Sequence, residues 1–566
     1  MSQGDTRGEA WSFAQLDDFW ERYRPLTPWG RDEAEARVIY TDREELERRY
    51  DDIAAAAAFI RSKAGDASSL DRVTYHLRRM PRLTLEPKDA YELLELFQIK
   101  KFMANYRGVA TSLGPAMAER FGLESPGPDS PASALAAELG KGGSDPETFY
   151  VADSFDGGLA EARAGVAAAD AVIARERVRA EAEARLSFGL SFDGREFLVA
   201  PKDAARSMAA SGGRYSVEPF DDSRYVVRLL PSAAAVEAMT DRERCLEAER
   251  RAEERVIARV SALAAAAMPE LARAVSATTR WDRARAGAAL AIELNMSRPD
   301  LDSDATILEA ARFVPCADEC ERMGLVYSPL SAEFRAGAVA LFGSNMGGKT
   351  VVLKTILFLQ LLTQAGLFVP ARRFGTRVYD RVEYVGELSG ERLAGLSGFG
   401  LEIWRLIASS RGEASGGDAT RRGDALIAFD ELARTTGSHE AEALLSAVVE
   451  TYAAQSGDRA FFATHFRGVA RVQGAEYVRM RGLDKAAAAA ALNGAGPDGN
   501  EAGPDGNEAG RALAERLAGI NRYMRYEVED DDGSGSESDA LAIASFLGLE
   551  RNIVERARYY LKKDGA

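Results

Sequence analysis

The spacing of apolar residues changes several times along the chain, and each change predicts a different kind of element. Residues 10–110 place apolar side chains three or four positions apart, as in YELLELFQIKKFMANYR, which is typical of amphipathic helices. Residues 123–147 are rich in Pro, Ser and Gly and predict a loop. From about residue 337, the short apolar runs GAVALF and ALIAFD are each followed by helix-like sequence, which predicts an α/β domain.

Two long stretches rich in Ala, Glu and Arg, residues 159–186 and 241–268, predict exposed helices that lean on each other. Between them, residues 186–200 and 214–230 carry aromatic and β-branched side chains separated by turn signals, which indicates short strands. We therefore interpret residues 159–275 as an arm of two long helices with a small β-containing tip at 187–229.

Near the C-terminus, the heptad GPDGNEA occurs twice in tandem, at 496–502 and 503–509, directly after a run of alanines. Two copies are too few for a solenoid, so we interpret 486–510 as a low-complexity insertion without an assigned function. The closing stretch ALAIASFLGLERNIVERARYYLKK predicts two short helices around Gly548.

Composition narrows the class of protein. The 88 acidic residues outnumber the 72 basic ones and give a formal net charge of −16, which argues against a protein that coats nucleic acid non-specifically. Three cysteines in 566 residues indicate a reducing compartment. The N-terminus has no signal-peptide pattern, and the apolar stretch 355–371 ends in proline, which favours a buried helix and strand over a membrane span. We expect a cytoplasmic protein without membrane contact.

Two of the cysteines, Cys316 and Cys320, lie four positions apart in CADEC. This spacing suits a metal pair, but no second pair or nearby histidine completes a site. We interpret them as ordinary reduced thiols.

The stretch LFGSNMGGKTVVLKTI has the spacing of a phosphate-binding P-loop between a strand and a helix. Its glycines let backbone N–H groups surround phosphate oxygens, Lys349 supplies a charge for the β- and γ-phosphates, and the Thr350 hydroxyl suits Mg²⁺. The predicted nucleotide-binding residues are Gly343, Ser344, Asn345, Met346, Gly347, Gly348, Lys349, Thr350 and Val351.

Two further strand ends carry candidate chemistry. Asp430 closes the apolar run ALIAFD, where P-loop enzymes hold Mg²⁺, and Glu431 is placed to orient or deprotonate the attacking water. His465 follows the run RAFFAT and is one of only three histidines in the chain, so we interpret it as a sensor of the γ-phosphate. Glu431, His465 and Lys349 are the predicted catalytic residues.

These elements, in this order, resemble the MutS family of ATPases, which belongs to the ABC-type group. GSNMGGKT is similar to the family's G-P-N-M-G-G-K-S, GLSGFGLEIWRL to its G-x-S-T-F-x-x-E loop, DELARTTGS to D-E-x-G-R-G-T-S, and FATHF to F-A-T-H-Y. Residues 540–562 resemble the family's terminal helix-turn-helix, which pairs two subunits. The resemblance implies a loop that reaches the partner subunit's nucleotide, formed here by Arg434, Thr436, Gly437 and Ser438, with Thr435 and Gly437 departing from the family pattern.

The resemblance also implies a fold, cofactors and an assembly. The expected fold is an α/β P-loop (ABC-type) ATPase domain joined to a mostly α-helical core with long lever helices and a small β-containing clamp tip. The expected cofactors are ATP and Mg²⁺, with Thr350 and Asp430 on the metal, and the expected assembly is a homodimer. The predicted domains are a helical core (1–158), lever helices with the clamp tip (159–275), the ATPase domain (276–485), the insertion (486–510) and a dimerisation region (511–566).

Two functions from different classes fit this pattern. The first is a dimeric ATPase that clamps branched or distorted DNA, without mismatch reading, because no aromatic wedge motif of the family's reading domain occurs before the arm. The second is a protein-remodelling ATPase that reactivates an adenosylcobalamin-dependent aminomutase together with a small partner subunit. The tip favours the second, since residues 187–229 hold six basic and six acidic side chains, whereas a DNA clamp is expected to carry surplus positive charge.

Overall fold

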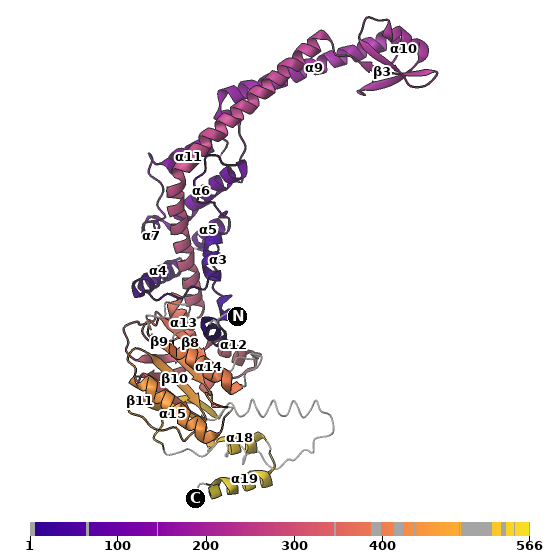
Figure 1. Ribbon diagram of the computed structural model, residues 1–566. Coiled ribbons are helices and arrows are strands. Elements are labelled where there is room, and N and C mark those ends of the chain that lie inside the picture. The colour runs from indigo at the N-terminus through magenta and orange to yellow at the C-terminus, as the bar shows by residue number, and fades with distance from the viewer. Residues whose placement is uncertain are drawn as a thin grey trace. The chain divides into compact units, whose positions relative to one another are not determined.

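The computed structural model describes residues 6–63, 67–143, 145, 147–343, 347–386, 398–411, 423–434, 436–485, 487, 523–533, 539–547 and 549–564. The chain forms two compact units (Figure 1). The first comprises Met1–Leu26, Gly30–Ala67 and Trp281–Ala566, and the second comprises Thr27–Trp29 and Ser68–Arg280. The five segments expected from the sequence were defined by their expected roles, whereas these two units are defined by contacts within the fold. The boundaries of the five segments therefore stay predictions.

A six-stranded sheet organises the first unit. Its order is β12-β11-β6-β10-β9-β8, in which β12 is antiparallel to β11 and the other five strands are parallel. The strands are β6 (Ala338–Phe342), β8 (Arg381–Val385), β9 (Ala425–Asp430), β10 (Arg459–Thr464), β11 (Ala475–Leu483) and β12 (Met524–Asp530). Near-continuous apolar strands are expected when helices cover both faces of a parallel sheet, so the predicted α/β class is confirmed.

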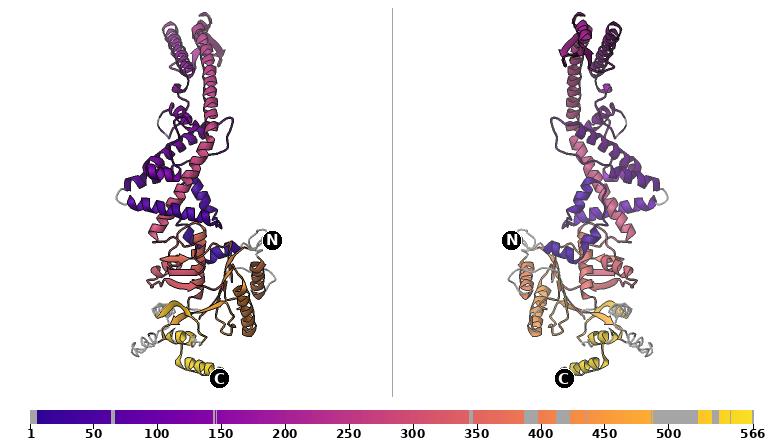
Figure 2. Two further views of the ribbon diagram at one scale, coloured as in Figure 1. Left: turned by 90° about the vertical axis from the view of Figure 1, so that its left-hand side faces the viewer. Right: turned by 90° about the vertical axis from the view of Figure 1, so that its right-hand side faces the viewer.

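Helices cover the two faces of this sheet (Figure 2). On one face, Phe429 of β9 and Phe462 of β10 pack in a common core with Leu445 and Val449 of α15 (Ser438–Ala454), and α14 (Gly398–Arg411) adds partly buried side chains. The other face meets α13 (Lys349–Gln364), which is buried along most of its length. Successive side chains of a strand point to opposite faces of the sheet. Phe429 points toward α15, so the next residue, Asp430, points toward α13.

The core of this unit offers a direct stability test. The rings of Phe429 and Phe462 stack with centroids 4.6 Å apart, and neither residue is more than 1% exposed. We expect Phe462→Ala to lower the free energy of unfolding by about 3–5 kcal/mol, because the cavity adds to the lost burial. Urea denaturation followed by circular dichroism measures this; Phe220→Ala, at a 59% exposed site in the second unit, is the control. An unchanged midpoint for Phe462→Ala would show that the site repacks.

Strands β11 and β12 are neighbours although 40 residues separate their facing ends. Leu483 pairs with Met524, and the amide of Asp484 donates a hydrogen bond to the carbonyl of Tyr523 at 2.8 Å. The GPDGNEA repeats between these ends lie outside the described residues. Ile543 of α18 (Asp539–Leu547) packs with Leu483 and Met524, and α19 (Arg551–Asp564) follows.

The first helices of the chain also belong to this unit. The ring of Phe13, at the end of α1 (Thr6–Phe13), stacks on Tyr384 of β8 at 3.8 Å. Phe19 of α2 (Leu16–Trp20) meets Phe358 of α13 edge-on at 4.9 Å. The remaining elements of the unit are α3 (Pro28–Glu35) from Gly30 onward, α4 (Arg43–Ser62), α12 (Val314–Arg322) and a small antiparallel sheet of β5 (Leu330–Phe334), β4 (Thr306–Ala311) and β7 (Arg373–Gly375).

Two long helices dominate the second unit. In Figure 1, α9 (Gly157–Phe188) runs beside the first part of α11 (Ala233–Glu293) to a sheet of three strands, and α11 belongs to the second unit up to Arg280. They are antiparallel, with ion pairs of 2.8 Å from Arg163 to Glu249 and 2.7 Å from Arg242 to Asp170. The other elements are α5 (Ala67–Arg78), α6 (Leu93–Leu113), α7 (Pro115–Phe121), α8 (Pro131–Gly140), η1 (Asp153–Phe155), β1 (Phe197–Pro201), α10 (Lys202–Ala209), β2 (Tyr215–Pro219) and β3 (Arg224–Leu229). The helix–strand–helix order agrees with the predicted arm, whose lever and clamp roles stay predictions.

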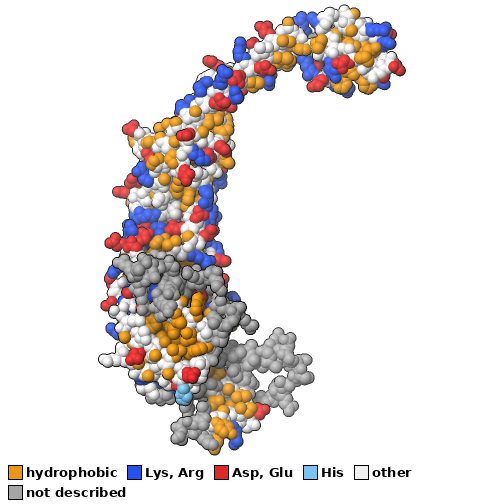
Figure 3. Space-filling view, in the orientation of Figure 1, with side chains coloured by type: hydrophobic (Ala, Val, Ile, Leu, Met, Phe, Trp, Pro, Cys, Tyr) orange, Lys and Arg blue, Asp and Glu red, His pale blue; other side chains and the backbone are white. Residues whose placement is uncertain are grey.

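Charges at the end of this arm neutralise one another. Basic and acidic side chains are interspersed there (Figure 3), and Arg224 and Arg228 pair with Asp221 and Glu218 at 2.7 and 3.0 Å. Arg214 pairs with Glu183 of α9. The tip thus holds equal numbers of basic and acidic side chains, and several of its basic side chains form ion pairs with acidic neighbours.

No helix in the described ranges is both long and apolar enough to cross a lipid bilayer.

Candidate functional site

The predicted P-loop lies between β6 and α13, as expected. Gly348 directly precedes α13 with φ 92°, a left-handed conformation that favours glycine. A Cβ at this position would also meet the ring of Tyr526 at 3.0 Å, so space and backbone conformation both call for glycine. Ser344, Asn345 and Met346 lie outside the described residues.

Lys349 is the first residue of α13 and is only 3% exposed. Its Nζ donates a hydrogen bond to the carbonyl of Gly343 at 2.7 Å, across the turn. Burial lowers the pKa of this ammonium group, while the nearby carboxylates of Glu431 and Asp430 raise it. A desolvated cation at the start of a helix is an arrangement suited to a phosphate.

Thr350, in the first turn of α13, lies close to Asp430, the last residue of β9. The hydroxyl Oγ1 of Thr350 lies 3.4 Å from Oδ1 of Asp430, at the end of β9. Burial raises the pKa of Asp430, and the contact with Thr350 opposes this rise. A half-buried carboxylate beside an exposed hydroxyl is a pair of hard oxygen donors of the kind that Mg²⁺ prefers, so these residues fit the predicted magnesium site.

Glu431 turns sharply out of the sheet. Its backbone is left-handed, with φ 53°, and its amide donates to the carbonyl of Ala463 in β10 at 2.9 Å. This turn brings its Oε1 to 3.7 Å from Nδ1 of His465 and its Oε2 to 3.7 Å from Nη1 of Arg434. The structure thus brings together Glu431, His465 and Arg434, which the sequence analysis singled out separately.

The loop after Glu431 is held in place by a second glutamate. The amide of Ala433, itself left-handed with φ 63°, donates to Oε2 of Glu402 at 2.9 Å. The amide of Thr436 returns to the carbonyl of Ala433 at 3.2 Å, Gly437 caps α15, and Ser438 begins it. Thr435 lies outside the described residues. Within one chain, Arg434 therefore lies beside its own Glu431, and the role of this loop toward a partner subunit stays a prediction.

Residues that the sequence analysis did not connect with this site form a hollow beside it. The hollow measures about 310 Å³ and borders Gly348, Lys349 and Thr350. The other lining residues used below are Cys316, Cys320, Tyr327, Met480 and Tyr526. The nearest of them, Tyr327, is about 20 residues from the P-loop in sequence, and the farthest, Tyr526, is more than 170 residues away. No local pattern can therefore connect them with the P-loop, although the spacing of the two cysteines is visible in the sequence.

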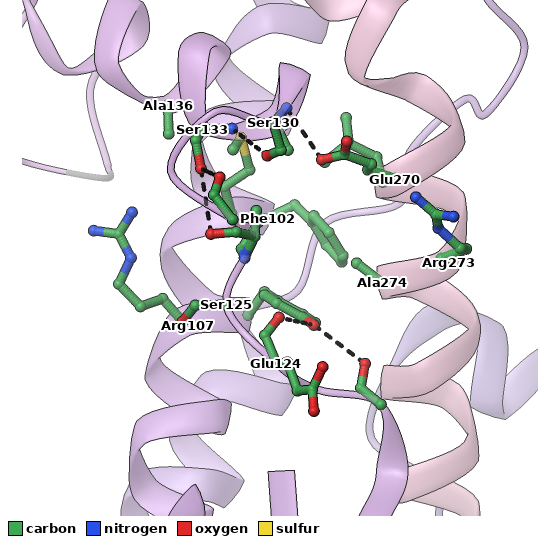
Figure 4. A pocket seen from close by; sticks show the side chains of 17 residues that line it. Phe102, Arg107, Glu124, Ser125, Ser130, Ser133, Ala136, Glu270, Arg273 and Ala274 are labelled. Carbon is green, nitrogen blue, oxygen red and sulfur yellow. Dashed lines mark hydrogen bonds between the residues drawn. The ribbon is translucent and has the colours of Figure 1, made fainter. Parts of the chain in front are cut away.

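A separate hollow of about 420 Å³ lies within the second unit (Figure 4). Its polar groups largely satisfy one another. The amide of Ala132 donates to Oε2 of Glu270, the hydroxyl of Ser133 donates to the carbonyl of Gly127, and that of Tyr106 donates to the carbonyl of Glu124. Such internally bonded walls need no ligand, and we assign this hollow no role.

In the part of the chain that the structure describes, no group of three or more His, Cys, Asp or Glu side chains is arranged to hold a metal ion. The predicted magnesium site does not require such a group, because it combines one carboxylate with one hydroxyl and leaves the remaining ligands to water and phosphate.

The sequence around this site is similar to known proteins. The family model described as MutS domain V matches residues 339–493, which contain the P-loop, Asp430, Glu431 and His465. The DNA mismatch repair protein MutS of Anaeromyxobacter sp. (strain Fw109-5) is 26% identical over 385 residues, which cover 64% of this chain and 36% of that protein.

Two further relatives match a shorter region. Endonuclease MutS2 of Thermomicrobium roseum is 32% identical over 256 residues, 43% of this chain and 29% of its own length. The DNA mismatch repair protein MutS of Granulibacter bethesdensis is 30% identical over 239 residues, 41% of this chain and 25% of its own length. The chain thus spans about a third or less of the length of these curated relatives.

Proposed function

Because the chain is a MutS-family protein, we propose that it binds ATP with Mg²⁺ around Lys349, hydrolyses it, and uses the cycle to operate a dimeric clamp on DNA. One observation carries this proposal: at the carboxyl end of β9, the carboxylate of Asp430 meets the Thr350 hydroxyl of α13, beside the buried Lys349. Glu431 follows Asp430 directly at this strand end. Ligands of open α/β sheets bind at these carboxyl ends.

Each residue has a proposed task. Lys349 binds the β- and γ-phosphates, and Thr350 and Asp430 hold Mg²⁺, which when bound offsets phosphate charge and orients the phosphates. Glu431 takes a proton from the attacking water, because its carboxylate lies at the strand end next to the phosphate-binding turn. His465 lies 3.7 Å from Glu431 and senses the γ-phosphate. The base of the nucleotide enters the hollow beside Tyr526.

The dimer would form through the C-terminal helices. Large apolar side chains are exposed on α19, where Ile553 is 47%, Tyr559 57% and Tyr560 52% exposed. Burying them against a second copy would remove this area from water. Arg434, about half exposed, would then face the partner subunit's nucleotide.

One observation favours a second candidate. The tip pairs its own charges at Arg214, Arg224 and Arg228, and DNA phosphates would have to compete with those partners. A protein client requires no such exchange, so remodelling of an enzyme, such as an adenosylcobalamin-dependent aminomutase with a small partner subunit, is the alternative.

The steady-state ATPase rate separates these functions. We expect stimulation by branched or mismatched DNA over plain duplex at moderate salt, because a clamp couples its cycle to the structure it encloses. Lys349→Ala protein, purified in the same way, controls for a contaminating ATPase. A basal rate that is indifferent to every DNA would contradict the DNA clamp and favour a protein client, whereas no rate above the control would contradict the ATPase itself.

A further inference from the structure

Two thiols face the proposed nucleotide hollow. Cys316 and Cys320 lie one turn apart on α12 and line the same hollow as Gly348 and Lys349. Both are free and partly buried. Residues four positions apart lie on the same side of a helix, so both side chains face the hollow from one face of α12.

The surroundings of the pair differ from those of a typical reactive cysteine. Burial, followed by the charge and hydrogen bond of Cys320, raises the pKa of Cys316 to about 11. Burial likewise raises the pKa of Tyr327 to about 12 and that of Tyr526, and both tyrosines interact electrostatically with the two cysteines. Tyr327 and Tyr526 line the same hollow as the two cysteines, and all four side chains are partly buried.

The spacing on the helix permits a bond between them. Residues four positions apart in an α-helix have Cα atoms about 6 Å apart, within the range of disulfides. Their Cβ atoms must approach further, so closure has to distort this turn of α12. Because that turn forms a wall of the hollow, its distortion changes the room beside Gly348.

We propose that Cys316 and Cys320 form a dithiol modification site that a low-molecular-weight disulfide oxidises to an intramolecular disulfide, which weakens nucleotide binding. This inference rests on the proposed function, since it assumes that the adjoining turn binds ATP. In the reducing compartment indicated by the composition, the pair stays reduced and the hollow stays open.

The chemistry proceeds by two exchanges. The thiolate of Cys320 attacks one sulfur of the small disulfide, which releases one small thiol and leaves a mixed disulfide on Cys320. The thiolate of Cys316 then attacks the Cys320 sulfur and expels the second small thiol. In total, the protein loses two hydrogens and the small disulfide gains them. Burial raises the pKa of Cys316 and disfavours its thiolate, so Cys320 attacks first.

The test compares each protein with itself before and after oxidation. The full chain is treated with oxidised glutathione; ATP binding is measured by equilibrium dialysis and the disulfide by peptide mass. We expect a Cys316–Cys320 disulfide, ATP binding weakened at least about tenfold, and recovery with dithiothreitol. Cys320→Ser should show no such change on oxidation. Cys245→Ser, on α11, should respond like the natural sequence.

The outcomes distinguish the two proposals. If the reduced protein binds ATP and the protein carrying the Cys316–Cys320 disulfide binds it equally well, only the proposed effect of the disulfide (the dithiol gate) is wrong. If saturating oxidant forms no such disulfide, the gate is also wrong, whatever happens at Cys245. If the reduced protein binds no ATP, the proposed function fails and the gate fails with it.

Discussion

Replacing Glu431 by glutamine is expected to leave ATP bound and to slow its hydrolysis by about 10²–10⁴-fold, the usual contribution of a general base. Glutamine keeps the size of the side chain and its hydrogen-bonding oxygen but cannot accept the proton of the attacking water. The backbone bond from Glu431 to Ala463 does not involve the side chain, so the turn out of β9 should persist. Single-turnover hydrolysis and equilibrium binding of ATP, measured on the same preparation, separate the two effects.

A matched control is available on the same unit. Glu450 lies on α15, is exposed, and is remote from the strand ends, so Glu450→Gln should hydrolyse ATP at the normal rate. A normal rate in Glu431→Gln would show that another group activates the water. Loss of ATP binding together with hydrolysis would show that the carboxylate supports the site rather than acting on water.

Replacing Lys349 by alanine is expected to weaken ATP binding by about 10- to 150-fold, because hydrogen bonds to charged groups contribute about 1.5–3 kcal/mol. The ammonium group is buried and donates to the carbonyl of Gly343 across the turn, which holds it where a phosphate would bind at the start of α13. Fluorescence titration with a labelled ATP analogue measures the loss, and Lys63→Ala, at the end of α4, serves as the control.

The folded state of this variant must be checked at the same time. Burial disfavours the charge of Lys349, so its removal should not unfold the unit, and the thermal transition should stay close to that of the unchanged chain. Undiminished ATP binding in a folded Lys349→Ala protein would place the phosphates elsewhere. A large fall in the transition temperature would instead assign the lysine a structural task.

Local pattern predicted the secondary-structure elements that surround the candidate site. Strand β6, the glycine turn and helix α13 stand where the spacing of Gly343, Gly348 and Lys349 predicts them. Likewise, Asp430 and His465 follow apolar runs that form adjacent parallel strands. Parallel strands bring their carboxyl ends to one edge, so residues 35 positions apart in sequence could be assigned to one site.

Contacts between segments that are distant in the sequence could not be predicted from local sequence patterns. The apolar spacing of residues 10–110 predicts helices, yet nothing in it tells that Phe13 stacks on Tyr384. Tyr526 reaches the hollow only because β12 returns alongside β11. The helix expected to end at residue 268 continues through Pro269 to Glu293, and Leu271 and Val275 just beyond the proline are buried. Tertiary packing here outweighs the proline's lost hydrogen bond.

The pairing of Asp484 with Tyr523 has a consequence for how this chain can change in length. The chain leaves the sheet at Asp484 and returns at Tyr523, and these two residues are adjacent. The amide nitrogen of Asp484 lies 2.8 Å from the carbonyl oxygen of Tyr523. For any flexible connection between two fixed ends, the entropy of closure grows only with the logarithm of the length, so that doubling the length costs about 0.6 kcal/mol. Duplication of GPDGNEA therefore meets little thermodynamic resistance at this point, and further copies, or a fluorescent label, can be accommodated there while β12 still carries Tyr526 to the nucleotide hollow.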